Sequence, residues 1–326
     1  MAETNLPRGL ILDLITPLKK NGEIDGRGLG RHLDRVLPHA QGLLLASPFT
    51  GEGRNLDSSQ REELLEKALV VIRGRIPVLV WISRETEERT IDTLLLLEKK
   101  VRSRNYPGQV FWVDTPLLYH SNRGLPKFYR ELFSEPDRPV LLLNHPDLIR
   151  LLATPLKRNN IRTSVLKELS RIPAVKGLIF QGSLDRANHY QKAVRTRNDF
   201  RIYDGDESRF LSYPSLSGVV SAGANLSPKV WGKITDSSIG GNEGKDTYPD
   251  YQYQIWEAGS YLRSLMTLYQ TMAPPLLKTV LSEMGVIESA TCTYEFGALG
   301  DTVNAPVSYT HLRAHETVLD LVCRLL

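Results

Sequence analysis

Short apolar stretches recur along the first 225 residues, separated by longer stretches that mix apolar and polar positions. These short stretches are rich in Val, Ile and Leu and are apolar throughout, which is typical of strands buried on both faces of a parallel sheet. The predicted strands are Leu10–Ile15, Gly42–Ala46, Pro77–Ile82, Val110–Val113, Pro139–Leu143, Val175–Phe180, Phe200–Tyr203 and Gly218–Ser221.

Helical periodicity and helix-start residues fill the intervals between these strands. Asp25, Asp57 and Thr86 are N-cap residue types that directly precede three helical stretches. The predicted helices cover residues 26–37, 60–72, 87–101, 125–133, 162–171 and 184–195. Eight strands alternating with helices predict an α/β fold, either a closed barrel or a doubly wound open sheet, and the number eight favours the (β/α)8 TIM barrel.

The pattern changes after Asn225. A polar Gly/Ser-rich loop at 237–246 precedes two predicted helices at 250–271 and 275–284. We therefore expect residues 1–225 to form the barrel and residues 226–306 to form a C-terminal helical extension of the same domain. Residues 307–326 resemble the translation of an adapter used in sequencing libraries, so they are treated as a non-native tail and excluded from functional reasoning.

Composition and charge exclude several classes of function. The chain is 41% hydrophobic, and its 41 basic and 37 acidic residues are mixed without a basic block, which argues against nucleic-acid binding. No segment approaches the ~18 apolar residues that span a bilayer. The two cysteines lack CxxC or metal-ligand spacing. We expect a cytoplasmic protein with no membrane partner, no metal and no cofactor.

An ordered set of local motifs carries a resemblance to a known family. The motifs are Thr16-Pro17, Pro48-Phe49-Thr50-Gly51-Glu52, Thr115-Pro116-Leu117-Leu118-Tyr119, Asn144-His145-Pro146, Gly205-Asp206-Glu207 and Gly218-Val219-Val220-Ser221. Together they resemble the dihydrodipicolinate synthase and N-acetylneuraminate lyase family over roughly residues 10–285. The resemblance implies an aldolase-type lyase or synthase reaction on a small 2-oxo acid such as pyruvate, through a lysine Schiff base, in a homo-oligomer.

The chain departs from the family at three positions that the reaction needs. Ile179 stands where the family has its Schiff-base lysine, Leu143 stands where it has its proton-relay tyrosine, and Phe49 replaces one hydroxyl residue of the carboxylate clamp. Isoleucine cannot form an imine. Lys176 is a weak substitute, because a residue three positions away on a strand points to the opposite face unless a bulge changes the register.

The remaining candidates lie at the ends of predicted strands, where barrels build their sites. Thr50 and the amides around Gly51 are predicted to bind a small anion, although capping of the next helix explains them equally well. Val220 and Ser221 are predicted to form the pocket wall.

Tyr119 and His145 are weak catalytic candidates, as a relay tyrosine and as an acid or base. The carboxylates Asp204, Asp206 and Glu207 are interpreted as a helix start in preference to a metal site.

Three functional hypotheses follow. The family's lyase reaction survives on altered residues, or the barrel is a non-catalytic small-acid-binding, structural or regulatory protein, or another chemistry uses the same fold. The simultaneous replacement of three polar positions by apolar ones favours the loss of Schiff-base chemistry.

Overall fold

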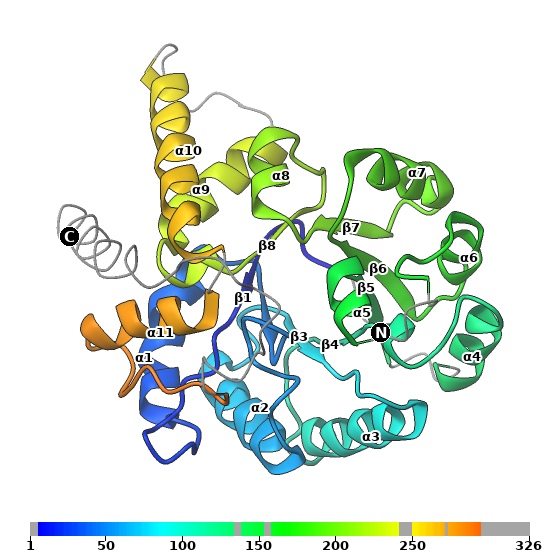
Figure 1. Cartoon of the computed structure of the whole chain (residues 1–326), viewed down its shortest axis with the longest axis horizontal. Coiled ribbons are helices and arrows are strands. Elements are labelled where there is room, and N and C mark those ends of the chain that lie inside the picture. The colour runs from blue at the N-terminus through cyan, green and yellow to red at the C-terminus, as the bar shows by residue number, and fades with distance from the viewer. Residues whose placement is uncertain (1–5, 134–137, 153–157, 241–249, 271–272, 295–326) are drawn as a thin grey trace.

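Eight parallel strands close into a barrel in the order of the chain (Figure 1). The computed structural model describes residues 6–133, 138–152, 158–240, 250–270 and 273–294. The strands are β1 (Gly9–Asp13), β2 (Gly42–Leu45), β3 (Val78–Trp81), β4 (Val110–Asp114), β5 (Val140–Asn144), β6 (Val175–Phe180), β7 (Arg201–Asp204) and β8 (Gly218–Ser221). All eight predicted strands are confirmed, and the fold is the predicted TIM barrel with C-terminal helices.

Alternate side chains along each strand point to two separate apolar layers. On β6, Ile179 points into the barrel, while Leu178 and Phe180 point toward the helices. Inside the barrel the layer contains Ile11, Leu44, Leu79, Trp81, Phe111, Val113, Leu141, Leu143, Ile179, Tyr203 and Val220, with Leu6 closing one end. The barrel is therefore a packed core, and polar chemistry is confined to the ends of its strands.

Helices surround the barrel and begin where the sequence places its caps. The carboxylate of Asp25, the carboxylate of Asp57 and the hydroxyl of Thr86 each accept a hydrogen bond from a backbone amide of the first helical turn. The helices between strands are α1 (Gly26–Val36), α2 (Ser58–Ile72), α3 (Glu87–Ser103), α4 (Leu125–Leu132), α5 (Pro146–Leu152), α6 (Thr163–Leu169), α7 (Leu184–Val194) and α8 (Glu207–Ser212).

Three helices were not predicted from the periodicity. The helices α5 and α8 have seven and six residues, too few to display a 3.6-residue repeat. The third, α9 (Pro228–Ile239), continues into the Ser-rich stretch that we expected to be a loop. It packs against β1 and β8, so it is the helix that completes the ring after the last strand.

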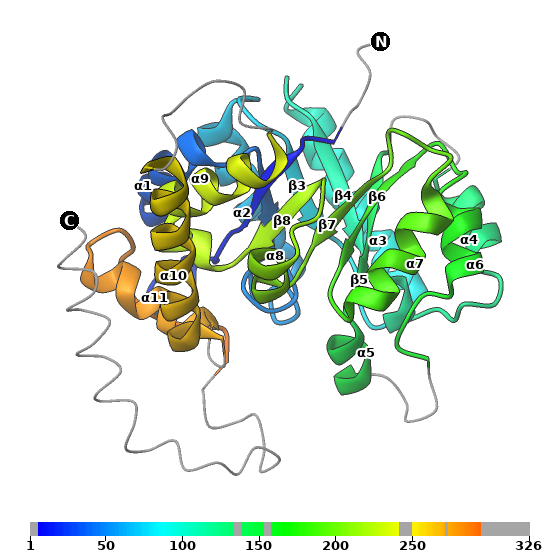
Figure 2. The same cartoon turned by 90° about the horizontal axis from the view of Figure 1, so that it is seen from above.

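Two further helices, α10 (Asp250–Tyr269) and α11 (Ala273–Glu283), lie at one side of the barrel (Figure 2). The long helix α10 contacts α8 and α9, and α11 packs on α10. Residues 307–326, interpreted as a non-native tail, lie outside the described residues.

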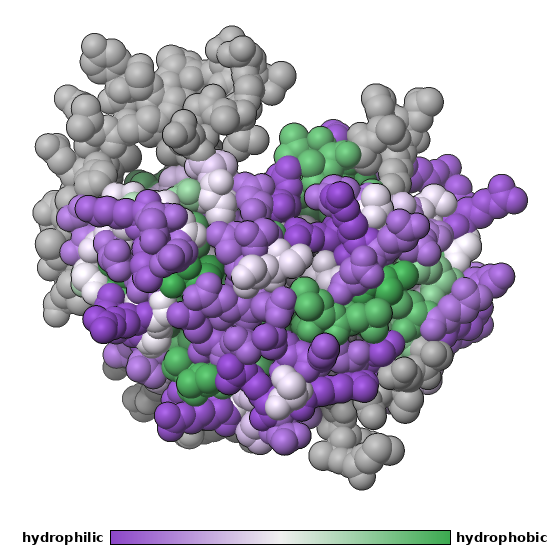
Figure 3. All heavy atoms as spheres, turned by 90° about the horizontal axis from the view of Figure 1, so that it is seen from below, coloured by the Kyte–Doolittle hydropathy of each residue, from purple (hydrophilic) through white to green (hydrophobic). Residues whose placement is uncertain are grey.

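The face of the molecule seen from below is predominantly polar. Figure 3 shows one face of the molecule, where hydrophobic side chains form separate patches within a mostly hydrophilic surface. Within the described ranges, no helix combines the length and the apolar character needed to cross a bilayer.

Candidate functional site

A cavity of about 660 Å³ opens at the C-terminal ends of the strands. Its wall is built by residues at or just after the ends of β1, β2, β5, β6, β7 and β8, and α10, α11 and Tyr294 cover one side. This volume suits a small organic molecule, and the location is where TIM barrels place their sites. The polar or ionisable lining residues include Asp13, Ser47, Thr50, His145, Gln181, Asp206, Glu207, Ser208, Tyr269, Gln270 and Tyr294.

Asp13 is the most unusual residue of this wall. It ends β1, and its Oδ1 is buried without a hydrogen-bond partner among the described residues. Burial raises the pKa of Asp13 from 3.8 to about 7, and repulsion from Glu207 adds to the increase, although the hydroxyls of Ser47 and Thr50 oppose it. At neutral pH this carboxyl group is therefore close to half protonated, as a general acid or base requires.

The loop after β2 is folded around its own backbone groups. The amide of Gly51 donates to the Ser47 hydroxyl at 2.8 Å, and the Gly51 carbonyl accepts from Thr16 at 2.7 Å. A Cβ on Gly51 would lie 2.4 Å from the Ser47 nitrogen, so the turn needs glycine. Gly51 does not line the cavity, and its amide is not available for the anion-binding role that we predicted. Thr50 does line the cavity, but its hydroxyl lies beside the Asp13 carboxyl group.

Glu207 opens α8 and is held in place by three donors. Its Oε1 accepts from the Ser221 hydroxyl at 2.5 Å and from the Gly223 amide at 2.8 Å, while its Oε2 accepts from the Tyr269 hydroxyl at 2.7 Å. Burial raises the pKa of Glu207, and these three donors act in the opposite direction. Ser221, predicted to form the pocket wall, instead lies outside the lining and positions Glu207, whereas Val220 does line the cavity.

The neighbouring carboxylates have structural roles. Asp206 caps α8 by accepting from the amides of Ser208 and Arg209 at 3.0 and 3.2 Å. Asp204 is buried against the Arg209 guanidinium, whose Nε donates to it at 2.6 Å. The helix-start interpretation is confirmed for Asp206, while Glu207 has the additional position on the cavity. The described residues contain no group of three or more His, Cys, Asp or Glu that could hold a metal ion.

His145 lies on the cavity wall as a neutral imidazole. Burial lowers its pKa to about 4, so the ring carries no charge at pH 7. Its Nδ1 accepts from the Leu148 amide at 3.3 Å, which leaves the proton on Nε2. The ring packs against Phe49 with 5.0 Å between centroids. His145 can therefore donate one hydrogen bond to a bound molecule.

The floor of the cavity is aliphatic. Leu44, Leu143, Ile179 and Val220 contribute to the lining, and no Lys or Arg of the described chain does so. Lys176 lies at the opposite end of β6, near Asp199, whose pKa is lowered chiefly by Arg197 and further by Lys176. The pairing of β5 with β6 is irregular at this point, because Val140 pairs with Val175 and Leu141 already pairs with Gly177. The register change that we considered is present, yet Lys176 stays outside the cavity.

Tyr119 belongs to a second buried cluster. Its hydroxyl donates to Asp114 Oδ2 at 2.7 Å, and the hydroxyls of Tyr129 and Ser83 donate to the same carboxylate at 2.5 and 2.6 Å. Burial raises the pKa of Tyr119 well above 10, and the neighbouring Asp114 raises it further. Tyr119 does not line the cavity, so the geometry places it away from the candidate site.

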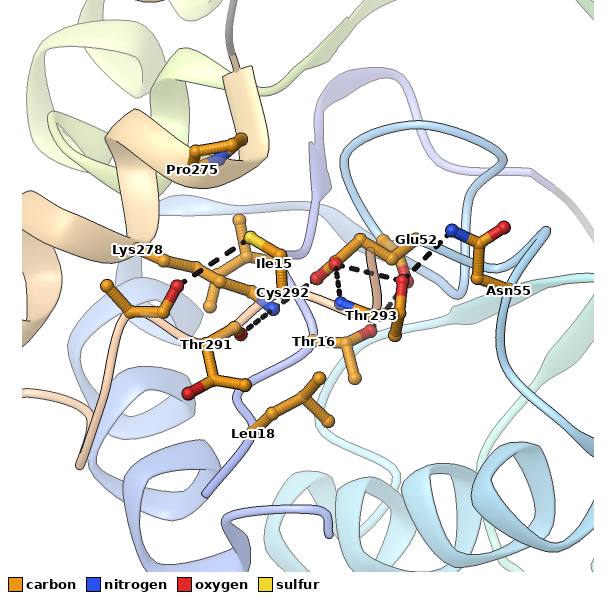
Figure 4. A network of polar contacts seen from close by, with 12 residues as sticks. Ile15, Thr16, Leu18, Glu52, Asn55, Pro275, Lys278, Thr291, Cys292 and Thr293 are labelled. Atoms are coloured by element: carbon orange, nitrogen blue, oxygen red, sulfur yellow. Dashed lines mark hydrogen bonds and ion pairs between the residues drawn. The ribbon is translucent and has the colours of Figure 1, made fainter. Parts of the chain in front are cut away.

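A buried ion pair ties the loop after β2 to the C-terminal part of the chain (Figure 4). Glu52 and Lys278 pair with no exposure of either side chain, and the Lys278 ammonium also donates to the Thr291 carbonyl at 2.8 Å. The Thr293 amide donates to Glu52 Oε1 at 2.7 Å. These contacts tie α11 and the segment after it to the loop that carries Thr50.

Sequence analysis did not identify Asp13 as a candidate site residue, because Asp13 lies within a stretch that was predicted to be a buried strand. A charged residue inside the apolar stretch Leu10–Ile15 was the available signal. The last residue of a barrel strand points toward the site, so a carboxyl group at this position indicates a functional candidate.

Comparisons with known proteins agree with the fold and the motifs. The model of the dihydrodipicolinate synthetase family matches residues 6–302. The chain is 28% identical to the 4-hydroxy-tetrahydrodipicolinate synthase of Thermotoga neapolitana over 286 residues, which cover 86% of this chain and 90% of the relative. It is 23% identical to the synthase of Nitrosospira multiformis over 313 residues, 95% of this chain and 93% of the relative.

Solved structures show the same architecture. The dihydrodipicolinate synthase of Thermotoga maritima superposes with a TM-score of 0.75 at 21% identity, over 97% of this chain and 98% of that one. The chloride-inhibited enzyme of Acinetobacter baumannii, solved with pyruvate, superposes with a TM-score of 0.74 at 17% identity, again over 97% and 98% of the two chains. At these identities the structural likeness establishes the fold alone.

Proposed function

Because the chain belongs to the dihydrodipicolinate synthetase family, we propose that it binds a small organic molecule in the cavity and does not form a lysine Schiff base with a 2-oxo acid. The observation that carries this proposal is the aliphatic floor, to which Ile179 contributes and no described lysine does. Imine formation needs a neutral primary amine within bonding distance of the carbonyl carbon. An isoleucine supplies neither a nucleophile nor a proton.

Two further replacements support the proposal. Leu143 lies on the cavity at the position where the family resemblance places a proton-relay tyrosine. Phe49 also belongs to the lining, and it lacks the hydroxyl that would help to hold a substrate carboxylate. Removing the amine, the relay and part of the anion clamp together is consistent with a pocket that no longer selects a 2-oxo acid.

The two lysines that could act as substitutes are poorly placed. Lys176 lies away from the cavity, near Asp199. Lys278 is fully buried and paired with Glu52, and a paired ammonium is not a nucleophile. Neither lysine offers a free amine to a molecule in the cavity.

A lyase reaction that relies on acid and base groups instead of an imine is the second candidate. Asp13 has a pKa of about 7 and faces the cavity, where it is suited to move a proton. His145, neutral and with a free Nε2 proton, is suited to donate a hydrogen bond to a developing oxyanion. This observation favours retained proton-transfer chemistry over a purely structural protein.

Borohydride trapping tests the proposal. The full chain is incubated with pyruvate and other 2-oxo acids and treated with borohydride, and the mass of the intact protein is measured by mass spectrometry. A family member that retains the lysine is the positive control. We expect no mass increase on this chain. A stable adduct mapped to one lysine would overturn the proposal.

The variant Ile179→Lys separates the lost amine from the lost proton path. It is expected to give no lyase or synthase turnover, because Leu143 and Phe49 still leave the imine without a relay. Turnover by this single variant would contradict that reasoning. Turnover by the unmodified chain without any trapped adduct would instead support the acid–base candidate. A homo-oligomer also stays a prediction, which light scattering on the purified chain would measure.

A further inference from the structure

The ionisable groups of the cavity give it an acidic character. Asp13, Asp206 and Glu207 line it, and the described lining contains no Lys or Arg. His145 is neutral at pH 7, and the pKa values of Tyr269 and Tyr294 are raised by burial, so these three groups add no charge. An anionic ligand in this cavity would meet repulsion without a counter-charge.

Asp13 provides the second, independent sign of a ligand. Asp13 lines the cavity, and its Oδ1 is buried with no hydrogen-bond partner among the described residues. Buried polar atoms are nearly always satisfied in proteins, and an exception at a cavity wall marks a place where a donor is missing. Glu207 lines the same cavity, is held in place by three donors and lies close enough to act electrostatically on Asp13.

Aromatic rings complete the surroundings. Phe49, Tyr269 and Tyr294 contribute their rings to the lining. The faces of such rings attract organic cations, and the Arg54 guanidinium already lies 5.9 Å from the centre of the Phe49 ring, just outside the lining. Carboxyl groups and aromatic rings together form the chemistry that recognises an ammonium group.

We propose that this cavity binds a small organic cation, a primary amine or diamine, whose charged nitrogen lies between Asp13 and Glu207. The proposal rests on the proposed function, because a cavity without a Schiff-base lysine is free to hold an amine. The volume of about 660 Å³ accommodates a small molecule rather than a folded partner.

Binding and protonation are linked in this site. An ammonium group beside Asp13 favours the ionised carboxylate, so binding releases a proton from a group whose pKa is about 7. The affinity for a cation therefore rises with pH by up to about tenfold per unit below pH 7 and levels off above it. The groups that act on the Asp13 carboxyl group are Glu207 and the hydroxyls of Ser47 and Thr50. Burial also raises the pKa of Glu207, and His145 in the same lining is neutral at pH 7.

The test uses three probes of equal chain length and different charge. Binding of 1,4-diaminobutane, 1,4-butanediol and succinate to the full chain is measured by ligand-observed NMR at pH 6, 7 and 8. We expect the diamine alone to bind, with a Kd of about millimolar for so small a molecule. Asp13→Asn should weaken its binding at pH 8 by at least about tenfold and remove the pH dependence. Asp92→Asn, which removes an exposed carboxylate on α3, is the matched control and should change neither.

Three results would overturn the cation assignment: tighter binding of succinate or pyruvate than of the diamine, an unchanged diamine affinity in Asp13→Asn, or no diamine binding at all. If Asp13→Asn does not fold, Phe49→Leu serves as a second variant and should weaken the diamine by removing a ring from the lining. The diamine carries no carbonyl, so its failure to bind leaves the proposed function intact. A trapped pyruvate imine would defeat the proposed function separately.

Discussion

Replacing Asp13 with asparagine should stabilise the protein at alkaline pH. Folding raises the pKa of this carboxyl group from 3.8 to about 7. This difference means that ionising the group costs ~4 kcal/mol more in the folded chain than in the unfolded chain. Asp13 is partly exposed to the cavity, and water there screens its charge. We therefore expect about half of this amount, ~2 kcal/mol, as the cost that the ionised carboxylate imposes on folding.

The sign of the pH dependence follows from the raised pKa. Below pH 4 the group is protonated in both folded and unfolded chains, and it has no effect on the free energy of unfolding. Between pH 4 and pH 7 the unfolded chain has released the proton and the folded chain holds it, so stability falls as pH rises. His145, whose pKa is lowered to about 4, contributes the opposite slope, but it is present in both proteins and cancels in their difference.

Urea unfolding at pH 5 and pH 8 measures this difference, with the buried Trp81, Trp112 and Trp231 as fluorescent reporters. The gain from Asp13→Asn should reach ~2 kcal/mol at pH 8 and be less than half as large at pH 5. The exposed control Asp92→Asn should stay within about 0.5 kcal/mol at both. A variant that is less stable than the parent at pH 8, or a gain that does not change with pH, would refute the reasoning.

Two further predictions concern buried cations that hold the site in place. Lys278→Met should lower the free energy of unfolding by about 3–5 kcal/mol, because it leaves Glu52 as an uncompensated buried charge. The double variant Lys278→Met/Glu52→Gln should lose less stability than the sum of the two single variants. Additive losses in urea unfolding would contradict this. Arg61→Lys should lower stability by about 1–3 kcal/mol, because a lysine cannot replace the guanidinium bonds to the carbonyls of Trp81 and Gly53; an unchanged thermal midpoint would count against it.

Much of the architecture could be predicted from the sequence, because strands that are buried on both faces have continuous apolar sequences. Continuous apolar runs identified every barrel strand, and cap residues such as Asp57 located helix starts to within two residues. The helices α5 and α8 escaped prediction because seven and six residues cannot establish a period. For α9, the Ser-rich composition concealed a helix that tertiary contacts with β1 and β8 support.

The site was less predictable because its residues are defined by direction and not by type. Tyr119 has the right chemistry for a relay, yet packing directs its hydroxyl to Asp114 and away from the cavity. Ser221 and its neighbour Val220 point to opposite faces of β8, so that Val220 lines the cavity while the Ser221 hydroxyl donates to Glu207. No local signal shows that Lys278 would be buried, since its partner Glu52 lies far away in the sequence.

The hydrogen bond between the Thr293 amide and Glu52 affects the order in which the protein folds during synthesis. These residues are separated by 241 positions, so the loop that carries Thr50 gains this contact only after Thr293 has left the ribosome. Contacts between such distant segments form late, because loop closure must precede them. Chains that stop before Thr291 would lack both the carbonyl that holds Lys278 and the amide that holds Glu52. The nascent barrel can therefore assemble its strands early, but it acquires a finished binding cavity only after residues 278–293 have been made.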